Sequence, residues 1–116
     1  MLVVDAEPLI RWTLRETLTT AGFEVIEMAP DPPFPAIGTV DVLVLDATLP
    51  NAGALGILER VRASNPRCRV LLLTSFDAIG LARLPDRSPH WRTLQKPFDL
   101  PAAVAAVRDL AQPQRR

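Results

Sequence analysis

The chain has 116 residues, which is enough for one domain with a single hydrophobic core. Its 13 basic and 13 acidic residues balance, which argues against nucleic acid as a primary partner because phosphate binding needs clustered positive charge. The single cysteine excludes a disulfide framework and indicates a reducing intracellular setting. No apolar run is long enough to span a membrane, and a strand begins too close to Met1 to leave room for a signal peptide. We therefore expect a cytoplasmic protein without a membrane partner.

The chain opens with a strand followed by a helix. Residues 2–4 form a short apolar run, which predicts a buried strand ending at Asp5. Pro8 can open a helix because the N–H that proline lacks has no partner in a first turn. Gly22 is a suitable stop for this helix. Its apolar stripe is predicted to be Leu9, Ile10, Leu14 and Leu18.

The next segment is unusual for a chain of alternating strands and helices. Residues 23–26 show more alternation than the first strand, which predicts a strand near the edge of the sheet. Residues 30–35 contain four prolines and cannot form an ordinary helix, although a helix normally connects two parallel strands here. We predict a loop, with at most a single turn over residues 36–39.

The second half begins with the apolar run Val42 to Asp46, which predicts a strand buried on both faces and ending in a carboxylate. The elements expected after it are a helix at 54–64, a strand at 70–73 before Thr74, two helical turns at 77–84 before Pro85, a strand at 93–95 before Lys96, and a helix after Asp99. The inward side chains of the two longer helices are predicted to be Leu55, Leu58 and Val61, with Ile57 as a further candidate, and Leu100, Val104, Val107 and Leu110.

Strands that alternate with helices predict an α/β fold with a doubly wound, parallel, five-stranded sheet. Right-handed crossovers favour the flavodoxin-like strand order 2-1-3-4-5. We assign residues 1–112 to this domain and residues 113–116 to a C-terminal tail.

Four polar side chains follow the ends of these strands. In the predicted order Asp5 and Asp46 share one crevice, which Thr74 and Lys96 enter from the next two strands. Neighbouring carboxylates such as these, with Glu7 nearby, favour recruitment of a cation, and oxygen ligands suit Mg²⁺. An ammonium and a hydroxyl beside them can stabilise phosphoryl transfer to Asp46. The alternatives are a turn or capping role for Asp46, or a structural ion pair between Asp46 and Lys96.

Four short motifs carry a resemblance to a known family. They are Val3-Val4-Asp5-Ala6-Glu7-Pro8-Leu9-Ile10-Arg11, Leu45-Asp46 with Leu49-Pro50, Leu73-Thr74-Ser75, and Lys96-Pro97-Phe98. Asp46 precedes Thr74 by 28 residues, and Thr74 precedes Lys96 by 22. In this order and at these separations the motifs resemble the receiver domains of two-component response regulators, and the resemblance covers essentially the whole chain.

The resemblance implies a role for each of these residues. Asp46 would be the phosphoacceptor of a phosphorelay, and Thr74 and Lys96 would contact the phosphoryl group. Asp5, Asp46 and the backbone carbonyl of Thr48 would bind Mg²⁺, and the Lys96–Pro97 peptide would be cis. A histidine kinase or phosphotransfer protein would donate the phosphoryl group, and a downstream protein or output domain would receive the signal. The resemblance implies no enzyme activity on an external substrate, and it leaves homodimer formation open.

The chain also departs from the family pattern. The second residue of the family's acidic pair is replaced by Ala6, so Mg²⁺ binding is expected to be weak, with Glu7 as an uncertain substitute ligand. The family's switch aromatic is replaced by Thr93. The second helix is replaced by the proline-rich loop at 30–35, and the fourth helix is shortened by Pro85. These departures keep open the alternative of a pseudo-receiver that binds partners independently of phosphorylation.

A third interpretation is enzymatic. The segment Asp46-Ala47-Thr48 is similar to the first motif of haloacid-dehalogenase-type phosphatases. Those enzymes need a second Asp two residues after the first, and Thr48 occupies that place here. The sequence also has no glycine-rich nucleotide-binding motif. We therefore expect no catalysis on an external substrate.

Overall fold

The computed structural model describes residues 1–31, 37–47, 53–74 and 91–111, except the side chain of Trp91. In chain order the elements are β1 (Leu2–Val4), α1 (Pro8–Thr20), β2 (Ile26–Met28), β3 (Val42–Asp46), α2 (Gly53–Ser64), β4 (Arg69–Thr74), β5 (Trp91–Gln95) and α3 (Leu100–Ala111). The fold is therefore α/β, as the alternation of strands and helices predicted.

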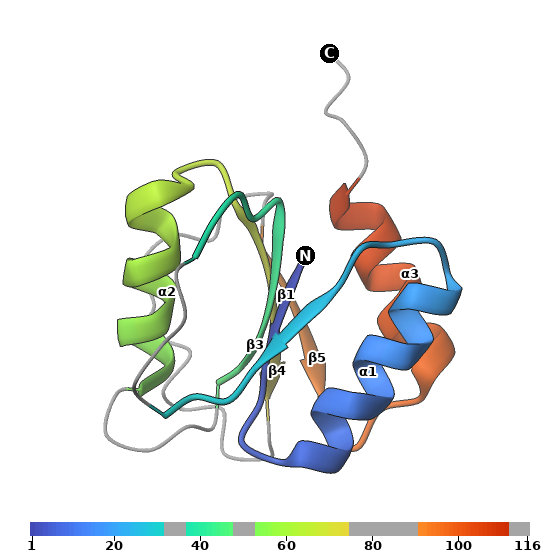
Figure 1. The fold of residues 1–116 in the computed structure, drawn as a ribbon. Helices are drawn as coiled ribbons and strands as arrows, with labels where there is room; N and C mark the ends of the chain where they lie inside the picture. The colour runs from blue at the N-terminus through green and yellow to red at the C-terminus, as the bar shows by residue number, and fades with distance from the viewer. Residues whose placement is uncertain (32–36, 48–52, 75–90, 112–116) are drawn as a thin grey trace.

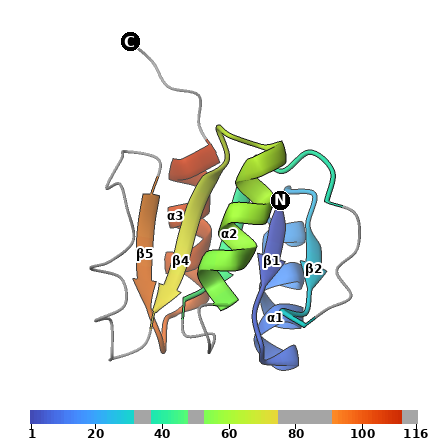
Figure 2. The same ribbon diagram turned by 90° about the vertical axis from the view of Figure 1, so that its left-hand side faces the viewer.

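The strands form one parallel sheet with the order β2-β1-β3-β4-β5. This is the flavodoxin-like order predicted from the sequence, and β3 lies at its centre. The arrows of β1, β4 and β5 point the same way in Figure 2. Because all strands run in one direction, their carboxyl ends meet at one edge of the sheet.

Helices cover both faces of the sheet. Figure 1 shows α2 on one side and α1 with α3 on the other. Leu43 and Leu45 of β3 belong to the core under α2, whereas Val42 and Val44 pack with α1 and α3. Alternate side chains of one strand thus enter opposite cores, which explains why its sequence is apolar throughout.

Helix α1 begins at Pro8 and ends before Gly22, as predicted. Gly22 has a φ of +105°, its N–H bonds to the Thr19 carbonyl, and the Phe23 N–H bonds to the Leu18 carbonyl. These two hydrogen bonds form a Schellman motif, which requires a residue with positive φ at the position of Gly22.

Two predictions in this region were wrong in detail. Leu9 is 73% exposed, because the buried positions of α1 are Leu14 and Leu18, and the residue one turn before Leu14 is Ile10. The second strand spans Ile26–Met28 rather than residues 23–26, because β1 is three residues long and its first partner is Ile26. The strand does lie at the sheet edge, as predicted.

The buried faces of the later helices also differ from the prediction. Leu55 is exposed in α2, where Ala54 lies one turn before the buried Leu58 and packs against the core. Ile57, the further candidate for an inward-facing side chain, is buried. In α3 the buried residues are Ala103, Val107 and Leu110. Val104 packs against this core as predicted although it is partly exposed, and Leu100 is also partly exposed. The small Ala103 lets the helix lie close to the sheet.

Some predictions concern residues outside the described part of the chain. They include most of the proline-rich loop at 30–35, the shortened helix at 77–84, and the tail at 113–116. Residues 37–41, which are described, contain no helix. Within the described residues, no helix is both long and apolar enough to cross a membrane.

Candidate functional site

The carboxyl edge of the sheet collects the polar residues predicted to form the site. Asp5 follows β1, Asp46 ends β3, Thr74 ends β4, and Lys96 follows β5. Asp5, Asp46 and Thr74 are the buried polar residues of the described core, with exposed fractions of 0%, 2% and 6%. Polar side chains are rarely buried at this level without partners, so this edge is a specialised region of the molecule.

The ammonium of Lys96 is the centre of this cluster. Its Nζ lies 3.0 Å from Oδ2 of Asp5 and 3.5 Å from Oδ2 of Asp46. The two acids of the first and third strands therefore meet through one cation, as the strand order predicted. The Lys96 side chain is 16% exposed, so water screens these charges only partly.

Burial disfavours the charge on Lys96, but the hydrogen bond and charge of Asp5, with the charges of Asp46 and Glu7, outweigh it and raise the lysine pKa. The ammonium is therefore charged at neutral pH. Burial has the opposite consequence for Asp5, whose pKa it raises, and the charge of Asp46 adds to this effect. The Glu7 N–H and Lys96 oppose the shift at Asp5 without cancelling it.

Hydrogen bonds hold both the side-chain carboxylate and the backbone carbonyl of Asp5. Its Oδ1 accepts the backbone N–H of Glu7 at 2.9 Å, which closes a local Asx turn. Its Oδ2 accepts a hydrogen bond from Lys96, and its backbone carbonyl accepts one from Nη1 of Arg11 at 2.8 Å. The carboxylate is thus fixed in position immediately after the strand ends.

The side chain of Glu7 also reaches Lys96. Its Oε1 lies 3.6 Å from Nζ, although the side chain is 65% exposed. Alternation along a strand left its direction undecided, but β1 ends at Val4 and Glu7 is the N-cap residue of α1. The chain has therefore turned before Glu7, and strand alternation does not apply to it.

Backbone hydrogen bonds align the other strand ends. The N–H of Lys96 bonds to the Thr74 carbonyl at 2.6 Å, and the N–H of Ala47 bonds to the Leu73 carbonyl at 2.8 Å. The peptide between Lys96 and Pro97 is cis, as the family resemblance implied. Thr48, whose carbonyl was predicted to bind metal, lies outside the described residues.

The donors at this edge are suited to a hard cation. Asp5 and Asp46 supply carboxylate oxygens, which Mg²⁺ prefers, and Mg²⁺ commonly uses one or two carboxylates with several waters. Among the described residues no group of three or more acidic, histidine or cysteine side chains is arranged to hold a metal ion. The residues therefore fit a magnesium ion that is largely hydrated, and they do not form a closed protein cage.

Sequence reasoning missed two neighbours of the site, Arg11 and Glu27. Arg11 contacts the Asp5 carbonyl, and its Nε lies 3.3 Å from Oε1 of Glu27 in β2. Arg15 lies 3.2 Å from the other Glu27 oxygen. The four-residue spacing of Arg11 and Arg15 placed them on one helix face, but no sequence signal linked that face to Glu27.

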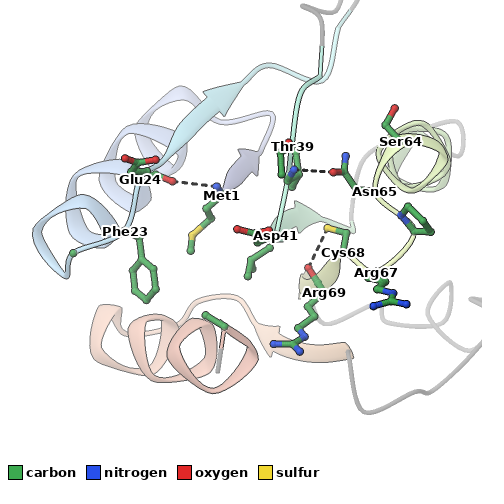
Figure 3. A pocket seen from close by; sticks show the side chains of 15 residues that line it. Met1, Phe23, Glu24, Thr39, Asp41, Ser64, Asn65, Arg67, Cys68 and Arg69 are labelled. Carbon is green, nitrogen blue, oxygen red and sulfur yellow. Dashed lines mark hydrogen bonds between the residues drawn. The ribbon is translucent and has the colours of Figure 1, made fainter. Parts of the chain in front are cut away.

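A pocket of about 960 Å³ lies at the opposite edge of the sheet, among residues that precede β1 and β3 and begin β4 (Figure 3). On its wall Oδ1 of Asn65 accepts the backbone N–H of Val40 at 2.9 Å. Cys68 also lies there and is 3% exposed, and burial raises its thiol pKa to about 11. This pocket is separate from the acid cluster.

The fold and the acid cluster define a flavodoxin-like protein whose charged site occupies the carboxyl edge of the sheet. No model of a known protein family matches the chain. The chain is 29% identical over 120 residues to the DNA-binding transcriptional regulator NtrC of Bradyrhizobium sp., covering 100% of the chain and 25% of that protein. It is 36% identical over 117 residues to the transcriptional regulatory protein TrcR of Mycobacterium tuberculosis, covering 95% and 44%.

A solved receiver-domain structure is also similar to this chain. The beryllofluoride-activated DrrB receiver domain matches with a TM-score of 0.67 and 25% identity, covering 96% of each chain. The chain belongs to the receiver domains of two-component response regulators. It spans about a quarter of the NtrC relative and less than half of TrcR.

Proposed function

We propose that this receiver domain accepts a phosphoryl group on Asp46 from a histidine kinase or phosphotransfer protein. A carboxylate oxygen of Asp46 attacks phosphorus, the bond to the donor breaks, and an aspartyl phosphate forms. The observation that carries this proposal is the convergence of Asp46 and Asp5 on the Lys96 ammonium, at 3.5 and 3.0 Å.

Each neighbouring residue has a separate role in this proposal. Lys96 is charged at neutral pH and moves from its carboxylate partners to an oxygen of the phosphoryl group. Thr74 offers its hydroxyl as a hydrogen-bond donor to another oxygen. Asp5 keeps the ammonium oriented through its fixed carboxylate. Together these groups compensate the negative charge that phosphoryl transfer brings to a buried carboxylate.

We propose Mg²⁺ as the cofactor, held by Asp5, Asp46 and the Thr48 carbonyl, with Glu7 as an outer contributor. A bound Mg²⁺ would neutralise the oxygens that meet at the site. Its affinity is expected to be low, because Ala6 brings no oxygen and Lys96 competes for both carboxylates.

The phosphorylated domain would signal through protein contact with a downstream protein or an output domain, and it would act on no external substrate. The length of the relatives supports an output segment elsewhere in a longer protein. We assign residues 1–112 to the receiver and residues 113–116 to the segment that follows it. The relatives give no support to a pseudo-receiver that works without phosphorylation.

Beryllofluoride with Mg²⁺ tests the proposal, because it mimics a phosphoryl group on a carboxylate. We expect amide NMR shifts to change around Asp46, Thr74 and Lys96. Asp46→Asn removes the nucleophile and should abolish the response. Asp41→Asn is the matched control, since Asp41 is exposed immediately before the same strand, and it should respond like the unmodified protein.

Two results would contradict phosphoacceptance at Asp46. One is the absence of any shift in the unmodified protein at saturating beryllofluoride and Mg²⁺. The other is an unchanged response in Asp46→Asn. Incubation with a small phosphodonor followed by intact-mass measurement gives an independent readout, in which one phosphoryl group should appear on the unmodified chain and none on Asp46→Asn.

A further inference from the structure

Arg11 contacts the backbone of Asp5 but is not part of the acid cluster. Nη1 of Arg11 donates a hydrogen bond to the Asp5 backbone carbonyl at 2.8 Å. This carbonyl lies immediately beyond the end of β1, where the sheet no longer supplies partners. The guanidinium therefore supplies a hydrogen-bond donor to the backbone carbonyl of Asp5, a residue that is completely buried.

The guanidinium of Arg11 is itself anchored on the edge strand. Its Nε bonds to Oε1 of Glu27 at 3.3 Å, while Oε2 of Glu27 lies 3.2 Å from Nε of Arg15. The side chains of Arg11 and Glu27 are 16% and 27% exposed, so the pair is partly shielded from water. A planar guanidinium can make both contacts at once because its donors point in fixed directions.

We propose that Glu27 and Arg11 are positioning residues for the acid cluster, although neither touches the Lys96 ammonium. Glu27 fixes the direction of the Arg11 guanidinium, and Arg11 fixes the peptide group that follows Asp5. That peptide orientation sets where the Asp5 carboxylate meets Lys96 and the Glu7 N–H. The proposal deepens the proposed function and rests on it only for the importance of the acid cluster.

The reason is geometric. Rotation of the peptide group after Asp5 would shift the next peptide group, whose Glu7 N–H lies 2.9 Å from Oδ1 of Asp5. The carbonyl of the peptide group after Asp5 is the one that Arg11 holds. With Ala6 in the next position, Asp5 is the one buried acid that this turn supplies. Errors in its position therefore cannot be compensated by the adjacent residue.

The first test uses the metal-free protein and reads the Glu7 amide by NMR hydrogen exchange. Glu27→Ala should accelerate exchange of this amide about three- to tenfold, as expected when one charged hydrogen bond is weakened. Arg11→Ala should accelerate it at least as much. If Glu27 acts through Arg11, the double variant should match Arg11→Ala, because Glu27 then has nothing left to orient.

Glu16→Ala is the matched control. Glu16 is an acid of α1 that pairs with Arg15 at 3.1 Å and, among the described residues, forms no ion pair or hydrogen bond with Arg11. It should leave exchange at Glu7 unchanged. Arg11→Lys keeps the positive charge without the guanidinium fork, and it should behave like Arg11→Ala if geometry rather than charge is responsible.

Mg²⁺ affinity provides the second readout, measured by NMR titration alongside urea unfolding. Glu27→Ala should weaken Mg²⁺ binding about three- to tenfold, beyond any change in overall stability. Unchanged Glu7 exchange in Glu27→Ala, or additive effects in the double variant, would overturn the positioning role. Neither of these two results depends on phosphorylation. A failure of the beryllofluoride test would refute phosphoacceptance alone and would leave the positioning role intact.

Discussion

Ala6 follows the buried Asp5 at the carboxyl edge of the sheet, where the family resemblance implies a second acid. Its methyl group supplies no oxygen to a cation, and the nearby Glu7 carboxylate is largely exposed and directed at Lys96. The chain thus keeps Asp46 and Lys96 at the carboxyl edge of the sheet, while Ala6 adds no oxygen to the acid cluster. At the scale of single residues, the acid cluster is balanced mainly by Lys96.

Ala6→Asp should therefore strengthen Mg²⁺ binding by about one to two decades, since a charged ligand contributes roughly 1–3 kcal/mol. Isothermal titration calorimetry measures this directly. Leu9→Asp is the control for added charge, because Leu9 is exposed three residues further along. An equal gain in Mg²⁺ affinity in both variants, or no gain in Ala6→Asp, would refute the idea that an acid at position 6 can bind the ion.

Cys68 gives a prediction on pH dependence. Burial raises the thiol pKa from 9.0 to about 11 in the folded protein. The folded state therefore retains a proton that the unfolded state has lost between these values, and stability should fall as pH rises from about 9 to 11. The loss is at most about 2–3 kcal/mol.

Urea unfolding at several pH values measures this effect. Cys68→Ala should lower stability at neutral pH by emptying part of the core, yet show a weaker decline between about pH 9 and pH 11. Identical slopes in the two proteins would show that the thiol does not contribute. Modification of the folded protein by iodoacetamide should also be slow at pH 8, where about one thiol in a thousand is ionised.

At the scale of elements, the glycine that follows α1 and the glycine inside α2 have opposite roles. Gly22 ends α1 with a φ of +105°, whereas Gly56 lies inside α2, and a Cβ at either position would meet no atom within 4 Å. Only backbone conformation then distinguishes them. Gly22→Ala should destabilise the protein by about 1 kcal/mol, and Gly56→Ala should stabilise it by about 0.5–1 kcal/mol.

The two glycine variants are each other's control in a denaturation experiment. Changes of the same sign would show that side-chain contacts, rather than backbone conformation, decide both positions. Gly22 was identifiable from the sequence because it follows an apolar helical pattern. By contrast, the bounds of β2 were not, because its pairing begins only where β1 offers a partner, at Leu2 with Ile26.

At the scale of the whole molecule, ligand binding at the strand ends should stabilise the entire domain. The site joins residues at the carboxyl ends of β1, β3, β4 and β5, so it exists only in the folded chain. Beryllofluoride with Mg²⁺, at one hundred times the dissociation constant, should raise the free energy of unfolding by about 2.7 kcal/mol. Asp46→Asn should abolish the gain and Asp41→Asn should keep it; a gain in both variants would place binding elsewhere.

The sequence by itself determined the strand order and the edge at which the polar residues gather. Runs that are apolar on both faces of the strand, such as Val42 to Leu45, indicate buried parallel strands. Right-handed crossovers leave few ways to arrange these strands. Asp5 follows such a strand and Asp46 ends one, whereas Lys96 follows the more polar β5. Their meeting could be predicted because topology alone brings parallel strand ends together.

Only the tertiary structure decided which side chains touch. The approach of Glu7 to Lys96 depends on where β1 ends, and the contact of Arg11 with Glu27 joins a helix to a strand through side-chain packing. The exposure of Leu9 likewise depends on the rotation of α1 over the sheet. These features arise from distances between elements, and a sequence pattern specifies the periodicity within an element without specifying its rotation against a neighbour.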